Sequence, residues 1–222
     1  AQQAFAAVVA EALGAGATPI GLGGGHEIAF AAWTGLRLAL ESRGDAGPIA
    51  VVNVDAHFDL RGDASASSGT PFRQILEDAA ARGRRVEYLC LGVSRFANTA
   101  ALFARARELG VRHVLDEDLR LDRFDFVRAE IEALLARCAH AYLTVCLDAF
   151  PAAVAPGVSA PAALGVDAAL VERFVDVVTG SGKLRIADVA ELNPRYDVDA
   201  RTARLAARLV ARIAEAVAGG VS

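Results

Sequence analysis

The sequence predicts an α/β fold of three layers, in which a parallel sheet lies between two layers of helices. Short apolar runs typical of buried strands alternate along the chain with segments of helical periodicity. This alternation favours a parallel sheet with helices on both faces. Polar residues directly follow several of the apolar runs, as expected where the strands of such a sheet end in a ligand site. The 222 residues contain no domain-sized linker or internal repeat, which indicates a single domain, residues 1–222.

The individual elements follow from local patterns. Ile28, Trp33 and Leu36 share one side of a helix, whereas the apolar run 49–52 is typical of a buried strand. Pro71 favours the start of a helix. In chain order we expect a helix at 4–13, a strand at 18–22, a helix from 28, a strand at 49–54, a helix at 71–82, a strand at 86–93, a helix at 99–109, a strand at 111–115, a helix at 124–138, a strand at 141–147, a helix at 167–178, a strand at 184–192 and a helix at 199–218.

Composition argues against several classes of protein. With 23 Lys and Arg against 27 Asp and Glu, the net charge of -4 gives no support for a nucleic-acid partner. No apolar run approaches the ~18 residues of a membrane span. The three cysteines lie far apart without a CxxC pair, which favours a reducing compartment over a disulfide framework. We therefore expect a cytoplasmic enzyme without a nucleic-acid or membrane partner.

A metal-binding motif follows the second expected strand. Asp55, His57 and Asp59 alternate in the segment Asn-Val-Asp-Ala-His-Phe-Asp, residues 53–59, so they share one side of an extended chain. Carboxylate and imidazole ligands suit hard or borderline divalent ions. We therefore interpret these three residues as metal ligands at the edge of the sheet.

Two further strand ends carry residues of the same kind. His26 follows three glycines after the first strand, and Cys146 and Asp148 end a later one. Because parallel strands end at one edge, all six side chains can meet there. Alone, His26 would fit a helix start and Cys146 a small buried apolar residue. Together the six groups favour two ions with shared ligands, which activate a bridging water, and the ligand types favour Mn²⁺, with Zn, Fe or Co as alternatives.

Four motifs occur in the order seen in the ureohydrolases. They are Gly-Gly-His-Glu at 24–27, Asp-Ala-His-Phe-Asp at 55–59, Thr-Val-Cys-Leu-Asp at 144–148 and Glu-Leu-Asn-Pro at 191–194. From about residue 19 to 209 the chain thus resembles the superfamily of arginases and agmatinases, which are binuclear manganese hydrolases. The resemblance implies an arginase-like fold and two Mn²⁺ ions, one held by His26, Asp55 and Asp59 and the other by Asp55, His57 and Asp148.

Cys146 departs from the arginase pattern, because its position normally holds a second bridging aspartate. A thiolate there could still bridge, and it would shift the metal preference toward Zn or Fe. A second departure concerns the start of the chain, which contains no methionine and begins within an expected helix. We expect an N-terminally incomplete part of a longer protein, with early strands of the sheet in the absent segment; loss of methionines by recoding is the alternative.

The loop after the metal motif separates the branches of this superfamily. Arginases and agmatinases carry a histidine there, whereas Phe72 occupies the corresponding position here. The runs 58–61 and 68–73 instead resemble the formimidoylglutamase branch. That resemblance implies hydrolysis of N-formimidoyl-L-glutamate to L-glutamate and formamide, a step of histidine degradation, by a metal-bridging hydroxide that attacks the formimidoyl carbon.

The same resemblance suggests roles for residues around the expected ions. Glu191 would pair with the cationic formimidoyl nitrogen through a charge-assisted hydrogen bond. Asp148 or Asp59 would relay a proton to the leaving amine. Arg61 and Arg73 flank the loop beside the metal motif, and their guanidinium groups suit the two carboxylates of the substrate. For each arginine, a solvated loop residue is the alternative.

Other functions fit some of the same residues. One is another ureohydrolase, such as a guanidino-acid hydrolase, an agmatinase or an arginase. A second is a metal-binding protein of this fold without catalytic activity, which Cys146 and Phe72 would favour. A zinc-dependent deacetylase is disfavoured, because the sequence lacks paired histidines before the metal aspartate. The resemblance also allows a homo-oligomer.

Overall fold

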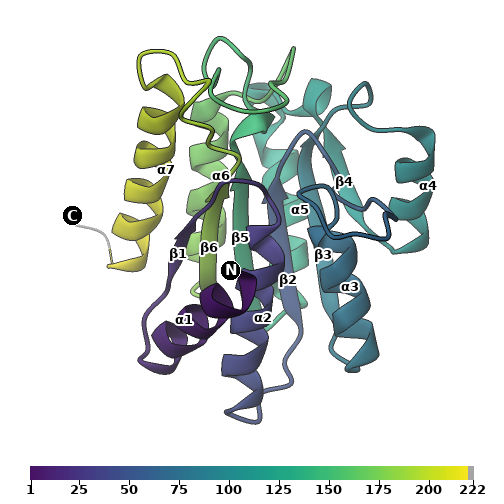
Figure 1. Ribbon diagram of the computed structural model, residues 1–222, viewed down its shortest axis with the longest axis vertical. Helices are drawn as coiled ribbons and strands as arrows, with labels where there is room; N and C mark the ends of the chain where they lie inside the picture. The colour runs from purple at the N-terminus through teal and green to yellow at the C-terminus, as the bar shows by residue number, and fades with distance from the viewer. Residues whose placement is uncertain (220–222) are drawn as a thin grey trace.

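A single sheet of six parallel strands forms the centre of the molecule (Figure 1). The computed structural model describes residues 1–219. The spatial order of the strands is β1-β6-β5-β2-β3-β4. Their bounds are Ile20–Leu22 (β1), Ile49–Val54 (β2), Val86–Val93 (β3), Arg112–Leu115 (β4), His140–Cys146 (β5) and Leu184–Ala190 (β6). The predicted three-layer α/β fold with a parallel sheet is confirmed.

Helices cover both faces of the sheet. They are α1 (Gln2–Gly14), α2 (Ile28–Glu41), α3 (Pro71–Ala81), α4 (Ala100–Glu108), α5 (Phe124–Ala136), α6 (Ala168–Gly180) and α7 (Arg201–Val217). Apolar residues of α1, α2 and α3 pack on one face and those of α5, α6 and α7 on the other. Each helix lies where the sequence predicts one, with end points that differ by a few residues.

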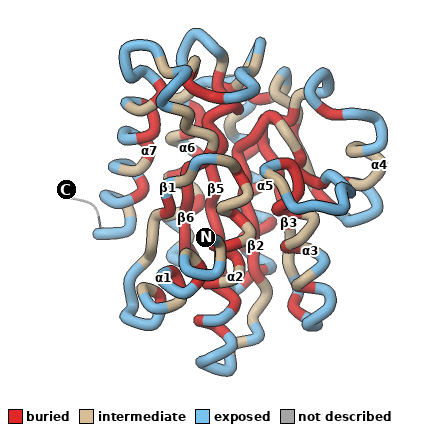
Figure 2. Tube along the Cα trace, viewed as in Figure 1, coloured by how far each residue is buried: buried red, intermediate tan, exposed pale blue. Residues whose placement is uncertain are grey.

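The strands β2 and β5 are buried along their whole length, as Figure 2 shows in red. In β2, Val52 and Val54 belong to the apolar cluster under α5 and α6, whereas Ile49 and Val51 belong to the cluster under α2. A central parallel strand must be apolar on both faces, which explains the continuous apolar run in the sequence. No helix of the described residues is both long and apolar enough to cross a membrane.

Several strand ends differ from the prediction by one or two residues, and two of these differences bear on the site. The first strand has three residues instead of five, because it pairs only with β6 at the edge of the described sheet. The strand β5 ends at Cys146, and the chain then turns through a short 3-10 helix, Leu147–Ala149, that carries Asp148. This turn lets Cys146 and Asp148 approach the same point from adjacent backbone segments.

The strand order places the predicted site residues together. The chain segments that carry them follow β1, β6, β5 and β2, which are consecutive neighbours in the sheet. In the parallel register, Val54 of β2 lies opposite Val145 of β5, and Cys146 lies opposite Ala190 of β6. The carboxyl ends of all four strands therefore lie close together at one edge of the sheet.

Candidate metal centre

Histidine and aspartate side chains meet at this edge. The His26 Nδ1 atom lies 2.9 Å from Asp55 Oδ2 and 3.1 Å from Asp59 Oδ2. The His57 Nδ1 atom lies 3.1 Å from Asp148 Oδ2 and 3.4 Å from Asp55 Oδ1. Asp55 is fully buried and faces both histidines, so it occupies the centre of the group.

The side chains form two overlapping sets of potential ligands. In one, atoms of His26, Asp55 and Cys146 all lie within 4.8 Å of one another; in the other, the same holds for Asp55, His57 and Asp148. Asp55 belongs to both sets. Asp59 extends the first set through His26. Two sets that share a carboxylate can hold two ions with a bridging ligand.

The backbone around these residues is unusual. Asp59 and Glu191 have φ angles of 51° and 70°, in the left-handed region that non-glycine residues rarely adopt. Each such residue costs about 1–2 kcal/mol. Surrounding hydrogen bonds hold the segment in place: the side-chain amide of Asn98 donates to Ala56 O and accepts from Phe58 N. Conformations of this kind are found where the direction of a side chain matters for function.

A buried nitrogen supports the fit of a metal ion. The His26 Nε2 atom lies 2.9 Å from Thr144 Oγ1, and that hydroxyl donates to Asp188 Oδ1 at 2.6 Å. Because the hydroxyl proton is directed to Asp188, Oγ1 accepts from the Nε2–H of His26. The opposite atom, Nδ1, faces the carboxylates of Asp55 and Asp59, and among the described residues it has no hydrogen-bond partner. A divalent cation between these groups would satisfy all of them.

The pKa values of the clustered side chains also indicate that several negative charges lie close together. Burial and the neighbouring Asp55 carboxylate raise the pKa of Asp59 to about 7. The same two causes raise the pKa of Asp148. Although burial lowers it, the carboxylates of Asp148 and Asp55 raise the pKa of His57 to about 11. A bound divalent ion would relieve this crowding, because its charge stabilises the ionised carboxylates.

A cavity of about 120 Å³ opens onto the cluster. Its walls include the two histidines, Asp59, Cys146 and Asp148, and also Arg61, Ser159 and Glu191. Glu191 is held in place on both oxygens: Oε1 accepts from the backbone N–H of His26 at 2.8 Å, and Oε2 accepts from Ser159 Oγ at 3.2 Å. Its carboxylate thus lies beside the potential metal ligands without belonging to either set.

The two predicted substrate arginines have different surroundings. Arg61 lines the cavity and makes no ion pair with another described residue, and a Cβ on Gly69 would lie 2.8 Å from its Cδ, so this glycine gives its side chain room. Arg73 does not line the cavity. Its guanidinium binds Glu77 and the carbonyl oxygens of Arg61 and Asp63. Arg73 therefore holds the 61–69 loop, and of the two arginines only Arg61 lines the cavity.

Phe72 is fully buried and also lies outside the cavity. Its ring meets the His26 ring edge-on, with 5.1 Å between centroids, and stacks on Tyr88 at 4.6 Å. This position therefore supports the back of the His26 ring and cannot exchange protons with a molecule in the cavity.

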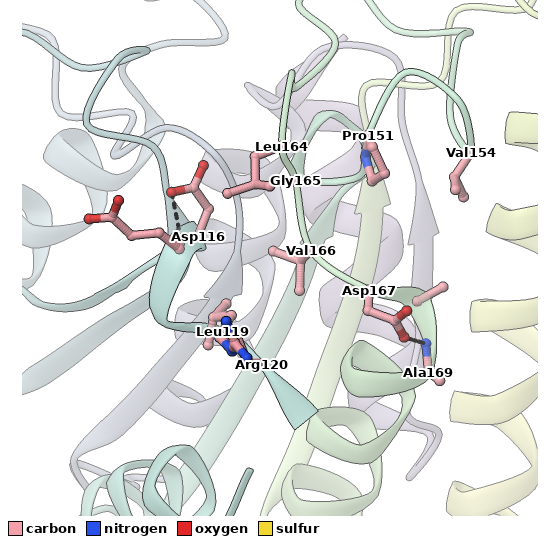
Figure 3. A pocket seen from close by; sticks show the side chains of 12 residues that line it. Asp116, Leu119, Arg120, Pro151, Val154, Leu164, Gly165, Val166, Asp167 and Ala169 are labelled. Atoms are coloured by element: carbon pink, nitrogen blue, oxygen red, sulfur yellow. Dashed lines mark hydrogen bonds between the residues drawn. The ribbon is translucent and has the colours of Figure 1, made fainter. Parts of the chain in front are cut away.

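A larger cavity of about 730 Å³ lies elsewhere along the same edge (Figure 3). It is bounded by the 3-10 helix Asp116–Asp118 and by residues 164–169, before and at the start of α6. Its acidic side chains are engaged locally: Asp167 accepts from Ala169 N, and Asp116 accepts from Glu117 N. It contains none of the potential metal ligands, so it is not the catalytic candidate.

Sequence reasoning missed the residues behind His26. Thr144 and Asp188 are both fully buried and lie opposite each other in the β5–β6 register. Tyr142 also donates its hydroxyl to Asp188. The available signal was a charged residue inside the apolar run of β6, since an aspartate in such a strand is costly unless it is hydrogen-bonded.

Replacement of Thr144 by valine tests this arrangement. The change keeps the shape of the side chain but removes the partner of His26 Nε2 and the donor to Asp188 Oδ1, whereas Tyr142 still donates to Asp188. We expect metal affinity to fall by roughly 10- to 100-fold, as is typical when the hydrogen-bond partner of a ligand is lost. Metal titration by calorimetry would measure this, with Thr179→Val in α6 as the matched control. Equal affinities for wild type and Thr144→Val would contradict the role given to Thr144.

Comparison with known proteins places these observations in a family. The model of the arginase family matches residues 1–215. The chain is 56% identical over 219 residues to the formimidoylglutamase of Ralstonia nicotianae, a match that covers 98% of this chain and 67% of that protein. It is 54% identical over 203 residues to the formimidoylglutamase of Aeromonas hydrophila, a match that covers 91% of this chain and 64% of that protein. The chain thus spans about two thirds of the length of these relatives.

Solved structures share the fold. A variant of the formiminoglutamase of Trypanosoma cruzi, solved with Mn²⁺, has a TM-score of 0.82 at 25% identity, and the match covers 99% of this chain and 71% of that one. The formimidoylglutamase of Bacillus subtilis has a TM-score of 0.80 at 20% identity, and the match covers 100% of this chain and 68% of that one. At this identity the match supports the fold alone.

Proposed function

This chain belongs to the arginase family of metal-dependent hydrolases, within its formimidoylglutamase branch, and we propose that it hydrolyses N-formimidoyl-L-glutamate to L-glutamate and formamide in histidine degradation. The observation that supports this proposal is that a single cavity is lined by the cluster of potential metal ligands, by Glu191 and by Arg61. The substrate has a cationic formimidoyl end and two carboxylates. Glu191 complements the first and Arg61 the second.

We assign the metal ligands as His26, Asp55 and Asp59 for one ion and Asp55, His57 and Asp148 for the other. The T. cruzi relative was solved with Mn²⁺, and the oxygen and nitrogen donors of this chain suit the same ion. When bound, two divalent ions supply the Lewis acidity that activates water at neutral pH.

The side chains of the cavity then orient the substrate and move protons. The carboxylate of Glu191, fixed by the backbone of His26 and by Ser159, accepts hydrogen bonds from the formimidoyl nitrogens and places the carbon above the metal-ligand cluster. Asp148 and Asp59 both line the cavity, so either can pass a proton to the nitrogen that leaves with glutamate. Phe72 takes no part in this transfer.

An assay of the Mn-loaded protein tests the proposal. N-formimidoyl-L-glutamate is offered beside arginine, agmatine and guanidinobutyrate, and release of glutamate and of urea is measured. We expect glutamate release from the first substrate alone. Urea release would instead assign the chain to another ureohydrolase activity, and metal binding without turnover of any substrate would favour a pseudoenzyme.

Arg61 gives a sharper test of the substrate. Its replacement by methionine keeps the length of the side chain and removes the carboxylate partner. A hydrogen bond to a charged group contributes about 1.5–3 kcal/mol, so kcat/KM should fall about 10- to 150-fold. Hydrolysis of a small formamidine without carboxylates should not change. Arg82→Met, in the exposed pair with Asp78, is the matched control; an equal loss on both substrates would refute carboxylate binding by Arg61.

We also propose that the protein is a cytoplasmic homo-oligomer. All three cysteines are free, which supports a reducing compartment. The oligomer rests on the resemblance to the family, and light scattering of the purified protein tests it.

A further inference from the structure

Cys146 differs from the other two cysteines in its surroundings. Cys90 and Cys138 each belong to one of the two apolar clusters, as buried cysteines usually do. Cys146 is 1% exposed but belongs to neither cluster. It ends β5, two positions after Thr144, on the face of the strand where the hydrogen bonds from His26 to Asp188 run.

The neighbours of Cys146 are potential metal ligands. Its Sγ atom donates to Asp148 Oδ1 at 2.8 Å. It also lies within 4.8 Å of the ligand atoms of His26 and Asp55. The thiol therefore belongs to the first ligand set and touches a member of the second, the position of a shared ligand. The unpartnered Nδ1 atom of buried His26 points into the same space, an independent sign of an ion there.

We propose that Cys146 binds the metal centre as a thiolate shared by both ions, and that it favours Zn²⁺, Fe²⁺ or Co²⁺ over Mn²⁺ relative to a centre with a carboxylate in that place. Thiolate is a softer donor than carboxylate and selects later or softer ions. On binding, the ion displaces the Sγ proton to solvent, and Asp148 Oδ1 loses its thiol donor and is freed for the metal. This inference rests on the metal ligands of the proposed function and is independent of the substrate.

Cobalt substitution tests the thiolate directly. The metal-free protein is titrated with Co²⁺ alone, and the near-ultraviolet spectrum is recorded without substrate. A cobalt–thiolate bond gives a charge-transfer band that oxygen and nitrogen ligands do not give. We expect the band in wild type and its loss in Cys146→Ser and Cys146→Asp. Cys138→Ser, which makes the same buried change just before the opposite end of β5, should keep the band.

Metal competition provides the second measurement. We expect Cys146→Asp to shift the ratio of Mn²⁺ to Zn²⁺ affinity toward Mn²⁺ by roughly 10- to 100-fold, an effect at least as large as the loss of an outer hydrogen-bond partner. Absence of the band in the wild-type cobalt protein would overturn the proposal without reliance on any variant. Persistence of the band in a folded Cys146→Ser protein would overturn it as well. A wild-type protein that shows the band but does not hydrolyse N-formimidoyl-L-glutamate would refute the proposed reaction and leave this inference intact.

Discussion

Replacement of Asp55 by asparagine is expected to abolish hydrolysis, with a fall in kcat/KM of at least about a thousandfold, equivalent to about 4 kcal/mol of transition-state stabilisation. Asp55 is the residue common to both ligand sets, and it is fully buried between His26 and His57. Asparagine keeps the size of the side chain and can still accept the hydrogen bond from the backbone N–H of His57. The loss would therefore report the missing charge, because an amide oxygen bridges two cations poorly.

Metal binding by the same variant separates a site defect from a folding defect. A metal at a hundred times its dissociation constant stabilises a native protein by about 2.7 kcal/mol, which for a chain of this size raises Tm by about 5–10 °C. We expect this rise in wild type and in Asp122→Asn, an exposed control. In Asp55→Asn the rise should disappear while the metal-free protein still unfolds cooperatively. Retention of two tightly bound ions by Asp55→Asn would contradict the shared role of Asp55.

The second large effect is expected for Glu191→Gln. The glutamine can still accept from the N–H of His26 through its amide oxygen, so the loop before α2 should keep its position. Because glutamine is uncharged, it cannot form an ion pair with the cationic amidinium of the substrate. Removal of one partner from a desolvated charge pair costs roughly 2–5 kcal/mol, so kcat/KM should fall by about 30- to 5000-fold.

Metal content distinguishes this role from a structural one. Glu191→Gln should bind metal as wild type does, whereas a residue that only supported His26 would lose metal together with activity. Glu77→Gln changes an exposed glutamate that pairs with Arg73 and serves as the matched control. Full activity of Glu191→Gln, or loss of its metal, would each remove Glu191 from substrate binding.

The sheet edge could be predicted because it depends on short-range pattern and one general rule. Asp55 and His57 follow a strand that is apolar on both faces, so the end of that strand was visible in the sequence. All strands of a parallel sheet end on the same edge, so residues at several strand ends can meet there. The closeness of His26, Asp55, His57 and Asp148 in the structure follows from this rule; their role as ligands stays a prediction.

The surroundings of the site could not be predicted in the same way. The hydrogen bonds from His26 through Thr144 to Asp188 depend on which strands are neighbours and on their register. Neither the strand order nor the register can be inferred from the sequence of a single segment. The distinction between Arg61 and Arg73 depends on a loop that folds back on itself. In this loop the guanidinium of Arg73 donates a hydrogen bond to the carbonyl oxygen of Arg61.

The sequence by itself determined the alternation of strands and helices, the family and the residue types at each strand end, because these depend on local periodicity and on motifs within a few residues. Only the tertiary structure decided that β1, β6, β5 and β2 are neighbours, that Cys146 lies among carboxylates and not in the apolar core, and that Phe72 supports His26. These outcomes depend on contacts between residues far apart in the chain, which packing of the whole sheet and its helices selects.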